Sequence, residues 1–156
     1  MSRRTAEFAS VILCVAMLLG IAIPMYQKIV NKASSVTAQH NLDIARKAVD
    51  QALMEASTST GATYSGIDAA FLISVSPEII WKDLPQGSQL QAYDKLDSLQ
   101  KKSIFLVPAE NGSELYLLAI TVDRKIIYSR GVDGAWDNDV TVPYKEGLPG
   151  LVTVSQ

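Results

Sequence analysis

A single acidic residue, Glu7, stands at the leading edge of a long apolar segment, directly after the basic pair Arg3 and Arg4. Residues 8–25 are all apolar, small, glycine or proline, with one serine hydroxyl among them. A carboxylate beside hydrocarbon is costly unless it is paired, and a plain membrane anchor has no use for it. Glu7 is therefore the first candidate functional residue, and its predicted chemistry is charge pairing.

Other residues capable of chemistry are scattered along the chain. His40 is the only histidine and falls on a polar helix face, so we expect no triad or metal site around it. Asp133, Asp137 and Asp139 share one loop that could hold calcium, but they lack the full EF-hand pattern. Asn111 begins an Asn-Gly-Ser glycosylation sequon on a predicted surface turn. We predict no catalytic residue, no metal and no cofactor, with these residues as secondary candidates for calcium binding and glycosylation.

Composition limits the possible classes of protein. The chain has 156 residues, enough for one compact domain plus an appendage, and its formal net charge is −2. That charge gives no basic field for nucleic acid, so no nucleic-acid partner is expected. The only cysteine, Cys14, lies in the apolar segment and cannot form an internal disulfide.

The apolar segment has about the minimum length for a helix that crosses roughly 30 Å of hydrocarbon. Arg3 and Arg4 precede it, and the positive-inside tendency predicts a cytoplasmic N-terminus with the residues after Gln27 outside. A secretory signal peptide begins similarly, but its apolar core is usually shorter and no A-x-A-like cleavage site follows here. We predict a single membrane span.

The next segment, 28–57, contains neither glycine nor proline and should continue the helix. Pro24 is the only helix breaker near the span, which predicts one kinked helix from about Thr5 to Ser57, on the order of 80 Å long. Gly20 and Pro24 favour a non-helical stretch between them. Two apolar stripes follow at helical spacing: Ile29, Ala33 and Val36, then Leu42, Ala45, Val49, Ala52, Leu53 and Ala56.

The remainder predicts a connecting region and a sheet. Residues 58–102 combine turn-forming residues with short apolar patches, which favour a connecting αβ-type segment with short helices, including one around Gln89 to Gln100. Residues 103–156 alternate β-rich runs with turns and should form an antiparallel β-sheet region. The expected strands are Ser103–Val107, Glu114–Val122, Lys125–Arg130 and two further runs, "VTVPY" and "LVTVS".

The predicted fold class is therefore α+β, with a long N-terminal helix packed on a C-terminal antiparallel sheet. Its predicted parts are an apolar transmembrane or filament-core helix over 1–27, an amphipathic continuation over 28–57, the connecting segment 58–102 and the sheet region 103–156. A domain of about a hundred residues cannot bury so long a helix, so the first half must pack elsewhere.

These residues resemble the N-terminal helix of type IV pilins and related type IV filament subunits. The resemblance is specific over residues 6–53 and depends on Glu7, the apolar run, "AIP" at 22–24 and the following "MYQKIV". The segment "GATYSGIDAAFLISVSPEIIW" looks like the region after the helix in some bacterial pilins.

The resemblance implies a structural subunit, a major pilin of an extracellular type IV pilus, rather than an enzyme. Such a subunit is made with a leader, methylated at its first mature residue, held in the inner membrane and polymerised by the pilus assembly machinery into a helical homopolymer on the cell surface. Glu7, Phe8 and Pro24 would be its assembly residues. The alternatives are a type II secretion pseudopilin, a competence pilin, or a single-span anchored periplasmic binding or enzymatic domain.

Two partners for Glu7 remain open. In the family the acid is thought to meet the N-terminal amine of a neighbouring subunit, which would neutralise two charges in an apolar core. Arg3 and Arg4 lie four and three residues before Glu7, so an ordinary intrahelical ion pair could satisfy the carboxylate within one chain.

Overall fold

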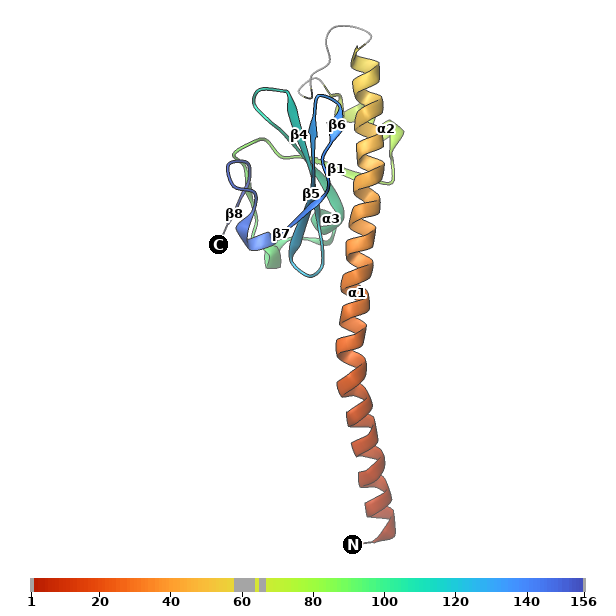
Figure 1. Ribbon diagram of the computed structural model, residues 1–156. Coiled ribbons are helices and arrows are strands. Elements are labelled where there is room, and N and C mark those ends of the chain that lie inside the picture. Colours follow the sequence, from red (N-terminus) through yellow and green to blue (C-terminus); the bar gives the residue numbers. More distant parts are fainter. Residues whose placement is uncertain (1, 58–63, 65–66, 156) are drawn as a thin grey trace. The chain divides into compact units, whose positions relative to one another are not determined.

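The computed structural model describes residues 2–57, 64 and 67–155, and the chain forms two compact units, Met1–Ala33 and Ser34–Gln156. Helix α1, Arg3–Ser57, contributes to both units (Figure 1). Ser2 begins this helix, since its hydroxyl accepts a hydrogen bond from the Thr5 amide at 3.4 Å. The prediction of one helix from about Thr5 to Ser57 is confirmed.

The expected non-helical stretch between Gly20 and Pro24 is wrong, because α1 is helical throughout this interval. Pro24 has no N–H, so only the Gly20 carbonyl loses its usual intrahelical donor. Unwinding the interval would strip several more backbone groups of their partners, and each unsatisfied group is expensive in an apolar setting. Continuing the helix through the proline is therefore the less costly solution.

Three successive strands form the centre of the sheet: β3 (Ser103–Pro108), β4 (Glu114–Ile120) and β5 (Lys125–Val132). They pair antiparallel, with Leu106 opposite Leu117 and Leu118 opposite Tyr128. Strands β6 (Ala135–Trp136) and β7 (Val140–Pro143) both pair antiparallel with β5. The predicted meander is thus confirmed, and the "VTVPY" run is a strand.

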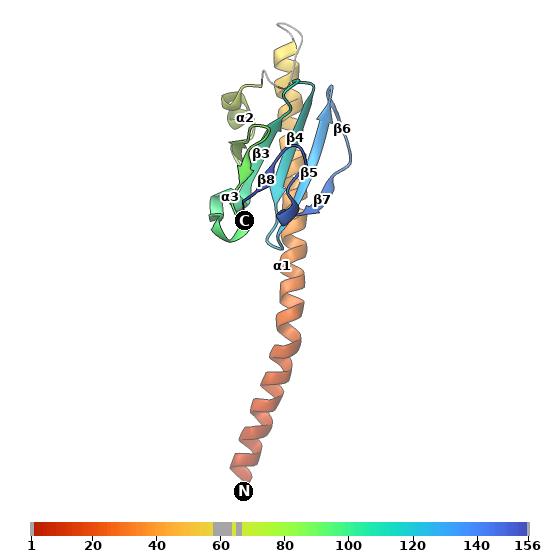
Figure 2. The ribbon, with the colours of Figure 1, turned by 90° about the vertical axis from the view of Figure 1, so that its left-hand side faces the viewer.

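One strand of this sheet is parallel. β1 (Ile80–Asp83) pairs with β3 in parallel register, Trp81 opposite Ile104, so the sheet is mixed and has the order β1-β3-β4-β5 (Figure 2). Helix α2 (Ala69–Val75) leads into β1, and the Asp68 carboxylate caps it by accepting from the Ala70 amide at 3.0 Å. The α+β layout is confirmed, with one parallel pair in a mostly antiparallel sheet.

The predicted helix around Gln89 to Gln100 is wrong. Gln89–Leu90 is strand β2, which pairs in parallel with β8 (Thr153–Val154), and a 3-10 turn, η2 (Tyr93–Lys95), follows. Only α3 (Ser98–Lys102) is α-helical, and a reciprocal capping box between Asp97 and Gln100 begins it. Pairing with a strand about sixty residues later overrides the local helical pattern, and no local signal in the sequence reveals that pairing.

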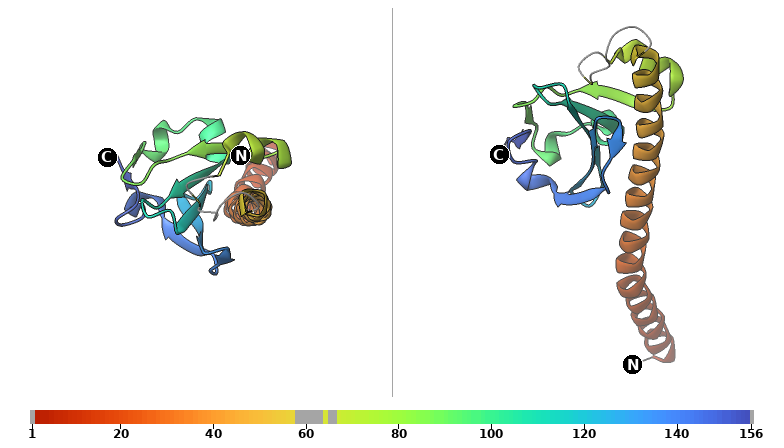
Figure 3. Two further views of the ribbon diagram at one scale, coloured as in Figure 1. Left: turned by 90° about the horizontal axis from the view of Figure 1, so that it is seen from above. Right: turned by 45° about the horizontal axis from the view of Figure 1, so that its top comes forward.

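The sheet carries apolar side chains on both faces, because neighbouring residues of a strand point to opposite sides. Residues 38–53 of α1 cover one face, and the segments around β2, β8 and the 3-10 turn η3 (Tyr144–Glu146) cover the other (Figure 3). Thus Ile104 and Leu106 pack toward α1, whereas Phe105 and Val107 pack toward the second layer.

The core confirms the second predicted apolar stripe of the helix, the one that begins at Leu42 and is called the distal stripe below. Leu42, Ala45 and Val49 are completely buried against the sheet. Ala38, Ala48 and Ala52 are buried beside them, and Leu53 packs against the cluster at its edge. Small alanines on this face let the helix lie close to the strands, so the amphipathic half of α1 has its partner within the same unit.

Candidate assembly site

The apolar segment of α1 is fully exposed in the described chain. Every residue from 8 to 25 is exposed, and Phe8 at its start is 70 % exposed. By length and composition this part of α1 could cross a membrane. Its large exposed side chains are Phe8, Val11, Ile12, Leu13, Val15, Met17, Leu18, Leu19, Ile21, Ile23 and Met25. A soluble monomer does not expose a continuous apolar surface of this kind to water, so the segment requires lipid or protein around it.

The apolar residues of this segment surround the helix on every side instead of following one stripe. A one-sided stripe needs one partner surface, whereas a helix that is hydrophobic all round must be enclosed. Pro24 lies inside the helix near the end of this segment and leaves the Gly20 carbonyl without its intrahelical donor.

Glu7 lies one helical turn after Arg3, whose Nε is 3.8 Å from Glu7 Oε1. The side chains are 95 % and 69 % exposed, respectively. An exposed pair of this geometry contributes only about 0.3–0.5 kcal/mol. The predicted local ion pair therefore exists, but it holds the carboxylate weakly and leaves it accessible to another cation.

Polar contacts fix the amphipathic half of α1 to the sheet. Arg46 donates to the Ser129 hydroxyl at 3.1 Å and to the carboxylates of Asp43 and Asp139. Burial lowers the pKa of Arg46, but the hydrogen bond to Asp43 and the charge of Asp139 outweigh it, so the pKa lies above its ordinary value. Arg46 thus remains charged and joins α1 to β5 and to the segment before β7.

A second set of contacts joins the far end of α1, and Tyr64 after it, to the β5–β6 hairpin. The Trp136 indole N–H donates to Asp50 at 2.9 Å, and the Gly134 amide donates to the Tyr64 hydroxyl at 3.0 Å. A side chain at Gly131 would lie 2.8 Å from the Trp136 ring, so glycine is required where the indole crosses the strand.

Two of the three aspartates proposed for calcium are engaged, each by a different arginine. Asp139 pairs with Arg46, and Asp137 accepts from Arg130 at 3.2 Å. Asp133 has a left-handed backbone, with φ of 51°. Across the described ranges 2–57, 64 and 67–155, no three His, Cys, Asp or Glu side chains come close enough to hold a metal ion.

The two remaining candidates are surface residues. His40 is exposed on α1. Asn111 is exposed in the β3–β4 turn, where its side-chain oxygen accepts from the Ser113 amide at 3.1 Å. The sequon thus stands on a surface turn, as predicted, where a modifying enzyme could reach it.

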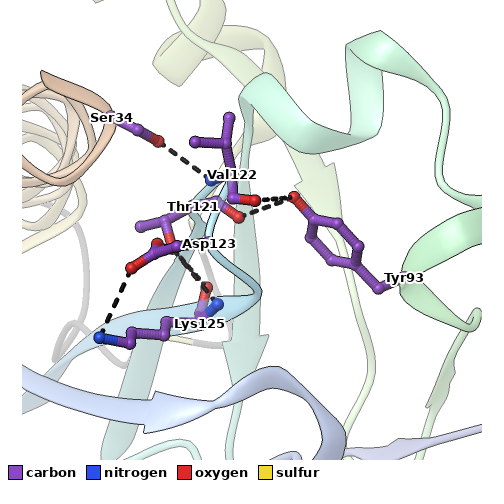
Figure 4. Close-up of polar contacts among 6 residues, drawn as sticks. All are labelled: Ser34, Tyr93, Thr121, Val122, Asp123 and Lys125. Carbon is purple, nitrogen blue, oxygen red and sulfur yellow. Dashed lines mark hydrogen bonds and ion pairs between the residues drawn. The ribbon is translucent and has the colours of Figure 1, made fainter. Parts of the chain in front are cut away.

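One polar arrangement was not anticipated from the sequence. The tip of the β4–β5 turn is held from two sides (Figure 4). On one side the Val122 amide donates to Ser34 Oγ at 3.1 Å. On the other side the Tyr93 hydroxyl lies 3.0 Å from the Thr121 carbonyl and 2.9 Å from the Val122 carbonyl. Lys125 and Asp123 form an ion pair at 3.4 Å beside it. The sequence indicates a turn at Asp123-Arg124, but nothing in it pairs that turn with Ser34 or Tyr93.

Comparison of the chain with protein-family models, curated proteins and solved structures gives no match. The arrangement itself is a long N-terminal helix whose first half could span a membrane and whose second half packs on a β-sheet. That arrangement is compatible with a pilin-like architecture.

Proposed function

We propose that this protein is a structural subunit, a major pilin, of an extracellular type IV pilus. The observation that carries the proposal is the fully exposed apolar segment 8–25, attached to a unit that buries its own core. The proposed activity is polymerisation, with no catalytic step.

The physical basis is an exchange of surroundings. In the inner membrane, lipid surrounds residues 8–25; in the filament, the same segments of other subunits surround them. Apolar area kept from water contributes about 25 cal/mol per Å², so either environment is strongly preferred over water. A segment that is apolar on all sides suits contact with several neighbours at once.

Glu7 supplies register in this proposal, with Phe8 as the first large apolar contact after it. In the membrane-held subunit the carboxylate stays near the polar boundary, beside Arg3. In the filament it meets the N-terminal amine of a neighbour, because an ionised group enclosed in an apolar core must be paired. Leaving such a group unpaired typically costs roughly 3–5 kcal/mol, which would reject subunits added out of register.

Pro24 is the third assembly residue proposed. The free carbonyl at Gly20 marks the place where α1 has one hydrogen bond fewer than the rest of the helix. The helix can adjust there at lower cost when lipid neighbours are replaced by other subunits.

Electron microscopy of sheared surface material, with immunogold labelling of this chain, tests the proposal. Long labelled filaments, lost when the gene is deleted and restored by its return, are expected. Labelled material confined to short periplasmic fibres would favour a secretion pseudopilin instead. A chain recovered solely as single detergent-soluble copies would overturn the polymer.

A further inference from the structure

Within the unit Ser34–Gln156, one end of the sheet is rich in basic residues. We call it the junction edge; it consists of α3 with η2, the β4–β5 turn 121–125, and η3. These segments meet because β3 begins where α3 ends, β4 and β5 are joined by the turn, and Lys125 pairs with Pro143 just before η3. Its basic residues are Lys95, Lys101, Lys102, Arg124, Lys125 and Lys145, and its acidic ones are Asp94, Asp97, Asp123 and Glu146.

Several of these charges are already committed. Asp97 caps α3, and Asp123 pairs with Lys125. Lys101 and Arg124 differ, since neither forms an ion pair with any described residue. Both cations instead lie over the ring of Tyr93, with Lys101 Nζ at 4.9 Å and Arg124 Cζ at 5.2 Å from its centroid. Two cations that form no ion pair with a described residue thus lie over the same aromatic ring.

The junction edge also exposes apolar side chains between its cations. Val122 at the tip of the turn is 48 % exposed, and Leu99 on α3 is 58 % exposed. The bonds to Ser34 and Tyr93 hold the tip in place (Figure 4). Apolar tips flanked by basic residues suit the interface of a bilayer, where the apolar part enters and the charges meet headgroups.

The opposite end of the same sheet carries the opposite charge. The β3–β4 and β5–β6 turns and the strand ends beside them hold Glu110, Glu114, Asp133 and Asp137, with Arg130 as the basic residue among them. The unit therefore carries basic residues at one end of its strands and acidic residues at the other. The basic end lies at Ser34, from which the chain continues toward residues 8–25.

We propose that the junction edge docks on anionic phospholipid headgroups while residues 8–25 span the bilayer. The helix between Met25 and Ser34 is about 13 Å long, whatever the angle between the two units. Headgroups extend about 5–7 Å beyond the hydrocarbon, and the Debye length near physiological salt is about 8 Å. Because Val122 N is 3.1 Å from Ser34 Oγ, the turn is within electrostatic reach of the membrane surface.

The inference rests on the membrane-held state of the proposed function and does not require a filament. If the inference holds, the unit Ser34–Gln156 contacts the membrane surface before assembly and leaves it when other subunits replace the lipid around residues 8–25. The basic residues of the junction edge favour anionic lipid as the occupant. A second copy would present either the same basic edge, which would repel it, or its acidic far end, at a distance that depends on how the copies assemble.

Depth-dependent fluorescence quenching tests the docking in the full chain. A fluorophore is attached to Val122→Cys in a Cys14→Ala background, and the chain is reconstituted in nanodiscs of phosphatidylcholine, with or without roughly 30 % phosphatidylglycerol. Nitroxide groups on the lipid heads act as quenchers. We expect strong quenching with phosphatidylglycerol, weak quenching without it, and loss of the difference in high salt.

The test variant is Lys101→Gln with Arg124→Gln, and the control is Lys47→Gln with Lys82→Gln, two exposed basic residues outside the junction edge. One basic residue near an anionic surface contributes about fivefold, so the test variant should lower the docked-to-free ratio about 25-fold, and the control should leave it unchanged. Circular dichroism melting verifies folding, and hydrogen exchange at 121–125 in unlabelled chains provides a second reading of docking.

Equal quenching in both lipids, or equal loss in both variants, would overturn the proposal. Loss of the quenching on addition of inorganic phosphate at constant ionic strength would replace it with a small-anion site. Quenching that depends on the number of chains in each disc would replace it with contact between copies. Flotation with the discs shows separately that residues 8–25 are inserted, so failed docking is distinguishable from a failed span.

Discussion

Residues 8–25 and residues 34–56 belong to one helix, yet they meet their surroundings in opposite ways. The first part is exposed at every position, whereas in the second part Leu42, Ala45 and Val49 are completely buried. Both parts are rich in apolar residues. The difference is their distribution: around the whole helix in one part and along a single face in the other.

The comparison shows how a helix indicates the location of its partners. A single face can be covered by a sheet of the same chain, as β3, β4 and β5 cover the second part. A helix without a polar face needs partners on every side, and residues 8–25 are exposed in the described chain. Placing the same charged residue in each part therefore tests this difference directly.

The largest effect is expected from Val49→Asp, compared with Leu18→Asp. Val49 is fully buried, and an unpaired carboxylate there should destabilise the unit Ser34–Gln156 by about 4 kcal/mol or more. Leu18→Asp should leave that unit's melting temperature unchanged and weaken membrane insertion by about 3 kcal/mol. Near-ultraviolet circular dichroism in detergent and a flotation assay measure the two effects. Unchanged melting of Val49→Asp would contradict the placement of the distal stripe.

Glu7→Ala should remove surface filaments while leaving membrane insertion and the melting temperature intact. The expected cost is the roughly 3–5 kcal/mol of a broken enclosed ion pair, a loss of more than a hundredfold in assembly. Arg3→Ala is the matched variant, because it removes only the pair at 3.8 Å within the chain. Normal filaments in Arg3→Ala with none in Glu7→Ala would favour the partner subunit; equal loss in both would favour the local pair.

Arg46→Ala should destabilise the unit Ser34–Gln156 by about 2 kcal/mol, because Ser129 and Asp139 both lose their donor. Lys47→Ala is the control, since Lys47 is exposed on the neighbouring position of α1. Urea denaturation followed by tryptophan fluorescence gives the difference. A midpoint for Arg46→Ala equal to that of the control would show that the Arg46 contacts do not hold α1 on the sheet.

An effect that develops only at alkaline pH is expected at Tyr144. Burial, with the nearby Tyr93, raises the pKa of Tyr144 to about 12, above the value near 10 in an unfolded chain. The folded state thus holds this proton longer, so the stabilisation is complete below pH 10 and falls by up to about 2 kcal/mol as the pH rises toward 12. Tyr144→Phe should flatten this part of the stability curve. An unchanged slope would assign the alkaline loss to other tyrosines.

Local patterns in the sequence predicted the helix and the central meander. The spacing of Leu42, Ala45 and Val49 specifies a helix face without reference to any other element, and the turns at 110–112 and 123–124 delimit three strands. The parallel strand β1 was not predicted, because its partner β3 is about twenty residues away and its own pattern is short. The same reason applies to β2, which has only two residues. Strand β8 lies in the run "LVTVS", which was predicted to be a strand, but its parallel pairing with β2 was not predicted.

The candidate site was predictable in part. Glu7 stands out as the acid before an apolar run and Pro24 as the proline inside a helix, whereas Phe8 is named only through the family resemblance. Their roles in assembly stay predictions. The junction edge was not predictable, because Ser34, Tyr93 and Arg124 come from three distant segments and meet only in three dimensions. Ordinary residues that converge from distant elements leave no local pattern.

The positions of the two tryptophans, one of them hydrogen-bonded to Asp50, determine what the intrinsic fluorescence of the chain reports. Trp81 and Trp136 are the only two indoles of the chain, and both belong to the unit Ser34–Gln156. Indole fluorescence therefore arises entirely from this unit. One indole is hydrogen-bonded to a carboxylate, and the other, Trp81, has no hydrogen-bond acceptor among the described residues. Intrinsic fluorescence will follow the folding of the sheet while residues 8–25 remain spectroscopically silent, in lipid or in a polymer.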